Sequence, residues 1–175
     1  MTQITKVFLF ALILFAPYFF DKSHAAESIV NFRLVCKEQG EDCHKATIKD
    51  SKEDIFVKNV PALTLADLKS ATPQSYDMPP EAIEAYKSQG YKDENIPKHV
   101  YQLLLKFNDP TVLRILTLMN IGQRLAIFIK DDLVTAPNIR EPIKGDTMAV
   151  SGPSFTEETV QALSDEINKA IDAKK

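Results

Sequence analysis

The chain has 175 residues, of which 45% are hydrophobic, and its formal net charge is −3. This length is enough for one domain with its own core and too short for two comfortable ones, so a single domain is expected. Phosphate binding needs a clustered basic surface, whereas the charges here are interspersed. The composition therefore argues against nucleic acid as a partner.

An apolar run opens the chain at residues 7–20, with Lys6 before it and the polar residues 21–23 after it. This layout is typical of a secretory signal peptide. Cleavage is predicted between Ala25 and Ala26, because small residues occupy the two positions that a signal peptidase reads. We therefore expect a signal peptide at residues 1–25 and a mature domain at residues 26–175.

The alternative for the apolar run is an uncleaved N-terminal anchor. A spanning helix needs about 20 apolar residues. This run is shorter and is interrupted by Pro17, so a cleaved signal peptide is favoured. The mature protein is then expected to be periplasmic or secreted, with no stable membrane span.

Two cysteines, Cys36 and Cys43, follow the signal peptide and enclose the turn-like residues 37–42. In an oxidising compartment this pair predicts a disulfide across a hairpin-like loop. Such a short loop would contribute about 2.5 kcal/mol in the chain-entropy model. His44 raises the alternative of a metal site, but the three side chains lack a fourth ligand nearby in sequence, so a disulfide is favoured and no metal is expected.

The elements before residue 72 are predicted to be strands and one short helix. Residues 28–35 alternate as a first strand, and residues 47–48 and 54–58 flank a polar run as a hairpin. Thr64 is a good N-cap for a short helix after them.

Residues 72–98 contain a further helix, which Pro79-Pro80 opens and Gly90 closes. We interpret this stretch as a lobe packed against the sheet or as a flap. An insertion that only covers core is the favoured interpretation, because long loops are tolerated cheaply.

Residues 99–107 alternate between apolar and polar side chains, which predicts a strand of a sheet with one covered and one wetter face. Asp109 as N-cap, Pro110 as first residue and Gly122 as stop mark the helix that follows. The face of this helix that is expected to be buried consists of Val112, Ile115, Leu116 and Met119.

Residues 125–129 carry apolar side chains on both sides of a strand, which predicts a central strand. A tight turn at residues 130–132 leads to a second strand at residues 133–135, with Asp131 expected at positive φ. Thr156 is the expected N-cap of a closing helix. The buried stripe of that helix is expected to be Val160, Leu163, Ile167 and Ile171.

Together these elements predict the α+β class: a two-layer sandwich of a mostly antiparallel sheet with helices packed on one face.

The segments IGQRLAIFI, LVTAPNIREPI and VSG followed by FTEE resemble the head of the first periplasmic domain of SecD, the protein-export subunit. The segment PALTLADLKSA is similar to a further motif of that family. A match over several segments in the right order is far more specific than one short motif. The motif residues, for which structural roles are expected, are Gly122, Arg124, Pro137, Glu141, Pro142, Gly145, Gly152, Phe155 and Thr156.

The sequence departs from the family pattern in three places. The family's usual Asp-Gly turn is Lys130-Asp131 here, and the stretch at about residues 72–98 does not map onto the pattern. SecD would continue into membrane helices, whereas this sequence ends at Lys175. The part that couples export to the proton gradient is therefore not expected.

Catalytic motifs are absent from the sequence. It contains no Gly-x-Ser-x-Gly elbow, Walker loop or His-Glu-x-x-His motif, and the mature chain keeps only His44 and His99. His99 opens a strand and is interpreted as a hydrogen-bonded surface histidine. We expect neither enzymatic activity nor a cofactor.

The resemblance implies a protein-binding module that acts as an accessory of protein export. Its expected partner is a translocating or envelope polypeptide. An exposed sheet edge, or an apolar groove beside it, could hold an extended segment by strand addition. Residues 76–98 are the expected place for such a groove. The alternative is a secreted interaction or effector-like protein that reuses the fold with no role in export.

Overall fold

The computed structural model describes residues 29–174, so the signal peptide predicted at residues 1–25 and its cleavage site, Ala25-Ala26, lie outside the described residues. The strands are β1 (Val30–Leu34), β2 (Cys43–Thr47), β3 (Asp54–Lys58), β4 (Leu63–Thr64), β5 (Leu68–Asp77), β6 (His99–Phe107), β7 (Leu125–Ile129), β8 (Asp132–Thr135) and β9 (Thr147–Ser151). The helices are α1 (Pro80–Ser88), α2 (Pro110–Met119) and α3 (Glu157–Asp172), with 3-10 turns η1 (Leu65–Asp67) and η2 (Asp93–Asn95).

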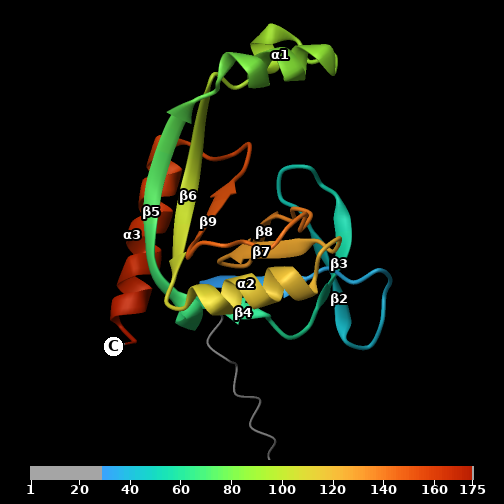
Figure 1. The fold of residues 1–175 in the computed structure, drawn as a ribbon, viewed down its shortest axis with the longest axis vertical. Coiled ribbons are helices and arrows are strands. Elements are labelled where there is room, and N and C mark those ends of the chain that lie inside the picture. Colours follow the sequence, from blue (N-terminus) through green and yellow to red (C-terminus); the bar gives the residue numbers. More distant parts are fainter. Residues whose placement is uncertain (1–28, 175) are drawn as a thin grey trace, which may run out of the picture.

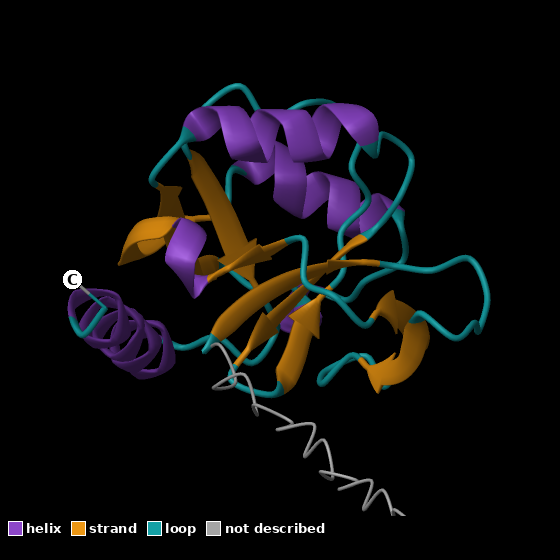
Figure 2. Ribbon diagram, turned by 90° about the horizontal axis from the view of Figure 1, so that it is seen from below, coloured by secondary structure: helices purple, strands orange, loops and turns teal. Residues whose placement is uncertain are grey.

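The predicted α+β class with antiparallel pairing is confirmed, and the strands divide among three sheets (Figure 1). A four-stranded sheet has the order β4-β1-β7-β8, a three-stranded sheet has the order β5-β6-β9, and β2 and β3 form a hairpin of their own. After β8, which pairs with β7, the chain crosses to the other sheet. There the next strand, β9, pairs with β6. Figure 2 shows the helices and sheets from below.

The main core lies between the four-stranded and three-stranded sheets and includes buried residues of α2 and α3. Phe32 of β1 meets Phe107 of β6 there, with ring centroids 5.6 Å apart. A second, smaller core lies under the β2–β3 hairpin and includes Val57 and Phe128. Every residue of β7 is buried, with alternate side chains in the two cores. The prediction of a central strand at residues 125–129 is therefore confirmed.

β6 is the central strand of the three-stranded sheet, and its hydrogen-bond register defines both edges of that sheet. The N–H of Phe107 donates to the carbonyl of Asp146 at 2.7 Å. Since backbone groups alternate in direction along an antiparallel ladder, those of Leu105 and Leu103 also face β9. The intervening residues of β6 therefore face β5.

The outer edge of β5 is closed by α3. The register turns the backbone of Ala71 away from β6, and Asn168 of α3 binds both of its groups. The N–H of Ala71 donates to Asn168 Oδ1 at 2.8 Å, and its carbonyl accepts from Asn168 Nδ2 at 2.8 Å and from Ser164 Oγ at 3.0 Å. Pro73 stands at the next outward position, where a missing N–H costs no ladder hydrogen bond.

The predicted buried face of α2 is wrong in part. Val112, Ile115 and Met119 are exposed (37%, 49% and 75%), whereas Leu113 and Thr117 are buried (0% and 1%). Apolar side chains surround most of this helix, so their spacing alone does not fix its rotation. In the structure, Leu113 packs in the main core, and the Thr117 hydroxyl beside it accepts a hydrogen bond from the N–H of Ile143 at 2.9 Å and donates within the helix.

The expected positive φ of Asp131 is also wrong, because Lys130 takes the left-handed conformation, with φ of 56°. The backbone N–H of Lys130 donates to the carbonyl of Ile29 at 2.7 Å, and its ammonium group pairs with Glu166 at 2.8 Å. These contacts hold Lys130 at the strained position of the turn. The predicted caps are confirmed: Thr64, Asp109 and Thr156 each accept a hydrogen bond from the first turn of their helices.

The stretch at residues 72–98 does not cover the core, contrary to the favoured interpretation. Its first part completes β5, which pairs with the full length of β6, and the two strands form an arm (Figure 1). α1 lies at the far end of this arm and has no buried residue. Among residues 29–174, no helix combines the length and apolar character that a membrane crossing requires.

The turn of the β2–β3 hairpin is held against the four-stranded sheet by Arg124. Its guanidinium group binds both carboxylate oxygens of Glu53, at 2.5 Å and 3.2 Å, and also donates to the carbonyl of Ala136 at 2.8 Å. The hydrogen bond from Arg124 lowers the pKa of Glu53 below its ordinary value. The ionised form of Glu53 therefore stabilises this arrangement.

Replacing Asn168 with alanine should lower the free energy of unfolding by about 1–3 kcal/mol, because the N–H of Ala71 loses its partner at a partly buried edge. Lys169→Ala, an exposed change one residue further along α3, should cost less than about 0.5 kcal/mol. Urea denaturation measures both. Equal effects would show that Asn168 does not close the β5 edge.

The stabilising effect of Glu53 should be lost in acid. Its pKa is lower in the folded than in the unfolded chain, so its contribution is present above the unfolded-state pKa and is lost as the pH falls through the folded-state pKa. The difference in stability between the natural protein and Glu53→Gln should shrink from about pH 6 to about pH 3. Urea denaturation at several pH values tests this, and a constant difference would contradict it.

Candidate binding groove

A groove of about 440 Å³ lies between β9 and the chain segment that follows β8. The lining is mostly apolar, and it also includes the exposed side chains of Arg140 and Glu141. The apolar side chains come from β7, β9 and the segment opposite β9; they are Leu125, Ile127, Pro137, Ile139, Ile143 and Met148. We call this hollow the β8–β9 groove.

The wall opposite β9 is fixed by backbone hydrogen bonds. Leu125 donates to the carbonyl of Pro137 at 3.0 Å, Ile139 donates to Gln123 at 2.8 Å, and Gly122 donates to Ile139 at 2.8 Å. The bond from Ile143 to the Thr117 hydroxyl, at 2.9 Å, anchors the end of the wall to α2. Because hydrogen bonds hold its backbone at both ends, at residues 137–139 and at Ile143, this wall is a preformed surface.

A second hollow of about 340 Å³ continues the groove past the end of β9. The two share Thr135, Pro137 and Ser151 as lining residues. The second hollow reaches Arg124, which is engaged with Glu53, and Asp50, whose carboxylate accepts from the Ser154 hydroxyl at 3.0 Å. The extended groove thus ends at charged side chains that are already partnered.

Four of the predicted motif residues line this extended groove, and they are Arg124, Pro137, Glu141 and Gly152. A β-carbon on Gly152 would lie 3.4 Å from Asp50 Oδ2 and 3.5 Å from Val134 Cγ1, which are ordinary van der Waals distances, so the packing at the end of β9 leaves room for a small side chain.

The other motif residues have structural places around the groove. Gly122 adopts a φ of 85° after α2. Pro142 and Gly145 lie in the connection from the groove wall to β9. Phe155 is buried in the main core, and Thr156 caps α3.

The edge of β9 that faces the groove is open. The backbone groups of Met148 and Val150 face β6, so those of Thr147, Ala149 and Ser151 point the other way. Within residues 29–174, no backbone hydrogen bond joins these outward groups to another segment. All three residues line the groove.

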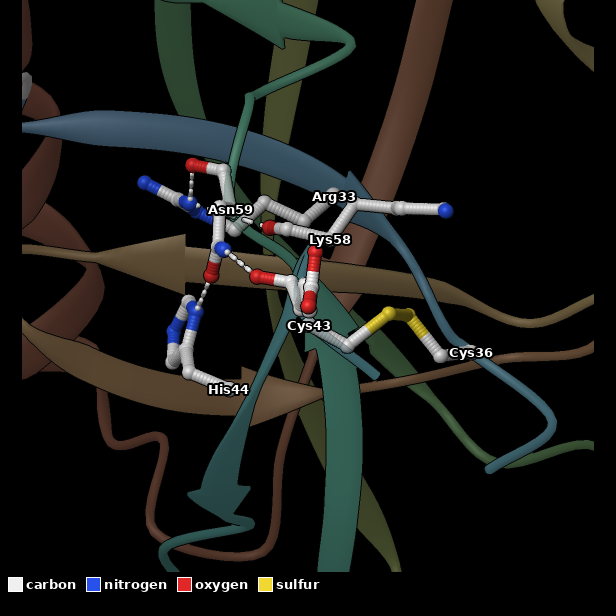
Figure 3. The surroundings of a disulfide bond; sticks show 7 residues. Arg33, Cys36, Cys43, His44, Lys58 and Asn59 are labelled. Atoms are coloured by element: carbon white, nitrogen blue, oxygen red, sulfur yellow. Dashed lines mark hydrogen bonds between the residues drawn. A yellow bond between two sulfur atoms is a disulfide. The ribbon is translucent and has the colours of Figure 1, made fainter. Parts of the chain in front are cut away.

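The two cysteines are joined in the predicted disulfide, which lies beside the β2–β3 hairpin (Figure 3). Neither cysteine lines the groove. His44 does not turn to the sulfur atoms: its Nδ1 lies 2.8 Å from Asn59 Oδ1. Arg33 donates to the carbonyls of Lys58 and Asn59 and ties β1 to the end of the hairpin. In the part of the chain that the structure covers, no three His, Cys, Asp or Glu side chains are placed to hold a metal ion.

Other residues singled out in the sequence lie apart from the groove. His99 Nδ1 is 2.8 Å from Asp77 Oδ1, and its ring packs edge-on against Tyr101. None of residues 76–98, the stretch in which a groove was expected, lines either of these two hollows. The alternation of exposed and apolar residues in β9 indicates a strand with one buried face, and the groove itself arises only where β9 meets the segment after β8.

Comparisons with known proteins agree with this architecture. Residues 98–169 match the family model described as SecDF, P1 head subdomain. One solved structure, of the membrane component SecDF that enhances protein export, has 20% sequence identity and a TM-score of 0.52, and the match covers 79% of this chain and 60% of that one. Another, SecDF in its super-membrane-facing form, has 17% identity and a TM-score of 0.38, with 79% and 23% covered.

A comparison with curated protein sequences found no match. The chain spans about 60% of the length of the SecDF chain with the higher TM-score. Residues 98–169 therefore match the SecDF P1 head subdomain, and the chain shares the fold of this part of SecDF.

Proposed function

We propose that this protein binds polypeptides without enzymatic activity, in the β8–β9 groove, as an accessory of protein export. The observation that carries the proposal is an apolar groove beside an open strand edge. Its first hollow is lined by residues between Thr117 and Ser151, all within the segment that matches the SecDF P1 head. SecDF is described as a membrane component that enhances protein export, which supports a polypeptide as the partner.

The lining of the groove favours a client with apolar side chains. Burying one side chain of the size of leucine contributes about 1.5–3 kcal/mol. A groove of about 440 Å³ has room for a few of these. After the entropy cost of ordering an unfolded client, such a site gives modest affinity. Modest affinity suits a protein that must release each client.

We further propose that residues 1–25 are a signal peptide and that residues 26–175 form one domain, which acts in the periplasm or after secretion. The Cys36–Cys43 disulfide supports an oxidising compartment, where such bonds persist. No cofactor, metal or nucleic acid takes part in the proposed role.

Thr135→Arg should weaken client binding at least about tenfold, because the long charged side chain would enter the groove and oppose apolar burial. Thr72→Arg, at an exposed position of β5 away from the groove, is the matched control and should change affinity less than about twofold. The measurement is fluorescence anisotropy with a labelled secretory protein kept unfolded by reduction and alkylation. Equal binding by both variants would place the site elsewhere.

A photo-crosslinking amino acid at Thr147 should capture secreted polypeptides in intact cells during their translocation. Thr147 faces the groove from an exposed position. Capture of envelope or host proteins alone, with no exported chains, would contradict the role in export and favour the interaction or effector-like alternative. The same amino acid at Thr72 is the control for nonspecific capture.

A further inference from the structure

We propose that the client segment adds to β9 as a fourth strand of the β5-β6-β9 sheet. This inference rests on the proposed polypeptide binding in the β8–β9 groove and specifies how that groove selects its client. It follows from a contrast between the two edges of one sheet. Edge strands present unpaired N–H and C=O groups, and proteins commonly block them with proline, a helix or charged side chains.

The β5 edge carries two of these protections. Pro73 removes an outward N–H, and Asn168 and Ser164 of α3 bind the outward groups of Ala71. The β9 edge carries neither: its sequence TMAVS contains no proline, and no strand or helix pairs with its outward groups within residues 29–174. The open edge also borders the apolar groove. The β5 edge is thus protected at Ala71 and Pro73, whereas the β9 edge has no such protection and can accept a strand.

The register of β9 fixes what each client residue does. Met148 and Val150 bury their side chains, at 8% and 1% exposure, and use their backbone groups to pair with β6. Thr147, Ala149 and Ser151 have exposed side chains and direct their backbone groups into the groove. Client residues opposite these three would exchange backbone hydrogen bonds with β9.

The intervening client residues, opposite Met148 and Val150, would lie on the same face of the sheet as those side chains. That face leads to the apolar lining of the groove, including Ile139 and Ile143. The preferred client is therefore an extended segment of about five residues with apolar side chains at its second and fourth positions. Its first, third and fifth residues need free N–H groups, so proline is excluded there.

This client chemistry points to unfolded chains. A strand inside a folded protein already uses its backbone groups, whereas an unfolded segment offers them along its length. Main-chain pairing supplies affinity with little dependence on sequence, and the alternate apolar positions add selectivity. The site is thus suited to many different clients.

Ala149→Pro tests the strand addition on the protein side. Proline there removes an outward N–H and leaves the pairing with β6 in place, because edge strands tolerate proline in this orientation. Affinity for an unfolded client should fall about tenfold, since a hydrogen bond is lost and the ring obstructs the client strand. Ser75→Pro makes the same change at an outward position of β5 and should alter affinity less than about twofold. Circular dichroism confirms that each variant is folded.

Peptides test the client side with the natural protein, so the result does not depend on a variant that folds. The host peptide has threonine at positions one, three and five, leucine at two and valine at four. N-methylation at position three should weaken binding about tenfold, and at position four less than about twofold. Equal effects of the two methyl groups, or no effect of Ala149→Pro, would overturn strand addition and leave groove binding intact.

Two other outcomes bear on the proposal. If neither the peptide nor an unfolded protein binds at all, the proposed function fails, and strand addition fails with it. If the protein forms a dimer that Ala149→Pro dissolves, the occupant of the β9 edge is a second copy of this chain, and the client proposal is overturned. Sedimentation velocity over a range of concentrations measures this.

Discussion

The structure depends on how the two edges of the sheet around β6 are treated, because every backbone N–H and C=O group that leaves water must find a partner. Asn168 meets this demand on one edge by holding both groups of Ala71, which also docks α3 on β5. The β9 edge has no such partner within residues 29–174. The asymmetry makes α3 part of the fixed body and leaves β9 as the place where the sheet can grow.

One end of the groove wall is anchored by a buried hydroxyl. Thr117 accepts from the N–H of Ile143, and this contact joins the buried face of α2, which also carries Leu113, to the groove wall. A polar side chain at 1% exposure is tolerated because its hydrogen bonds are satisfied. Helix α2 turns Val112, Ile115 and Met119 outward. The apolar residues that the sequence analysis expected to face the core are therefore mostly exposed, and the buried face carries Leu113 and the hydrogen-bonded Thr117 instead.

Local features explain which predictions succeeded. The caps at Asp109 and Thr156 depend on contacts within a single turn, so residue type and spacing are sufficient to place them. The strand β7 was recognisable because both of its faces are apolar. This pattern is typical of a strand that is covered on both sides. The prediction of positive φ at Asp131 failed because contacts with residues distant in sequence, Ile29 and Glu166, hold Lys130 in that conformation. The groove could not be located for the same reason, since its walls come from segments that meet only in the fold.

The sequence by itself determined the α+β class, the caps, the central strand, the disulfide and the resemblance of the part from residue 98 onward to the SecDF head, because each is written in neighbouring residues or in the order of short motifs. Only the tertiary structure decided which face of α2 is buried and where α1 lies. It also decided which sheet edge is closed and that Arg124, Pro137 and Gly152 surround one groove. These features depend on hydrogen bonds between segments far apart in the chain, and periodicity carries no information about such partners.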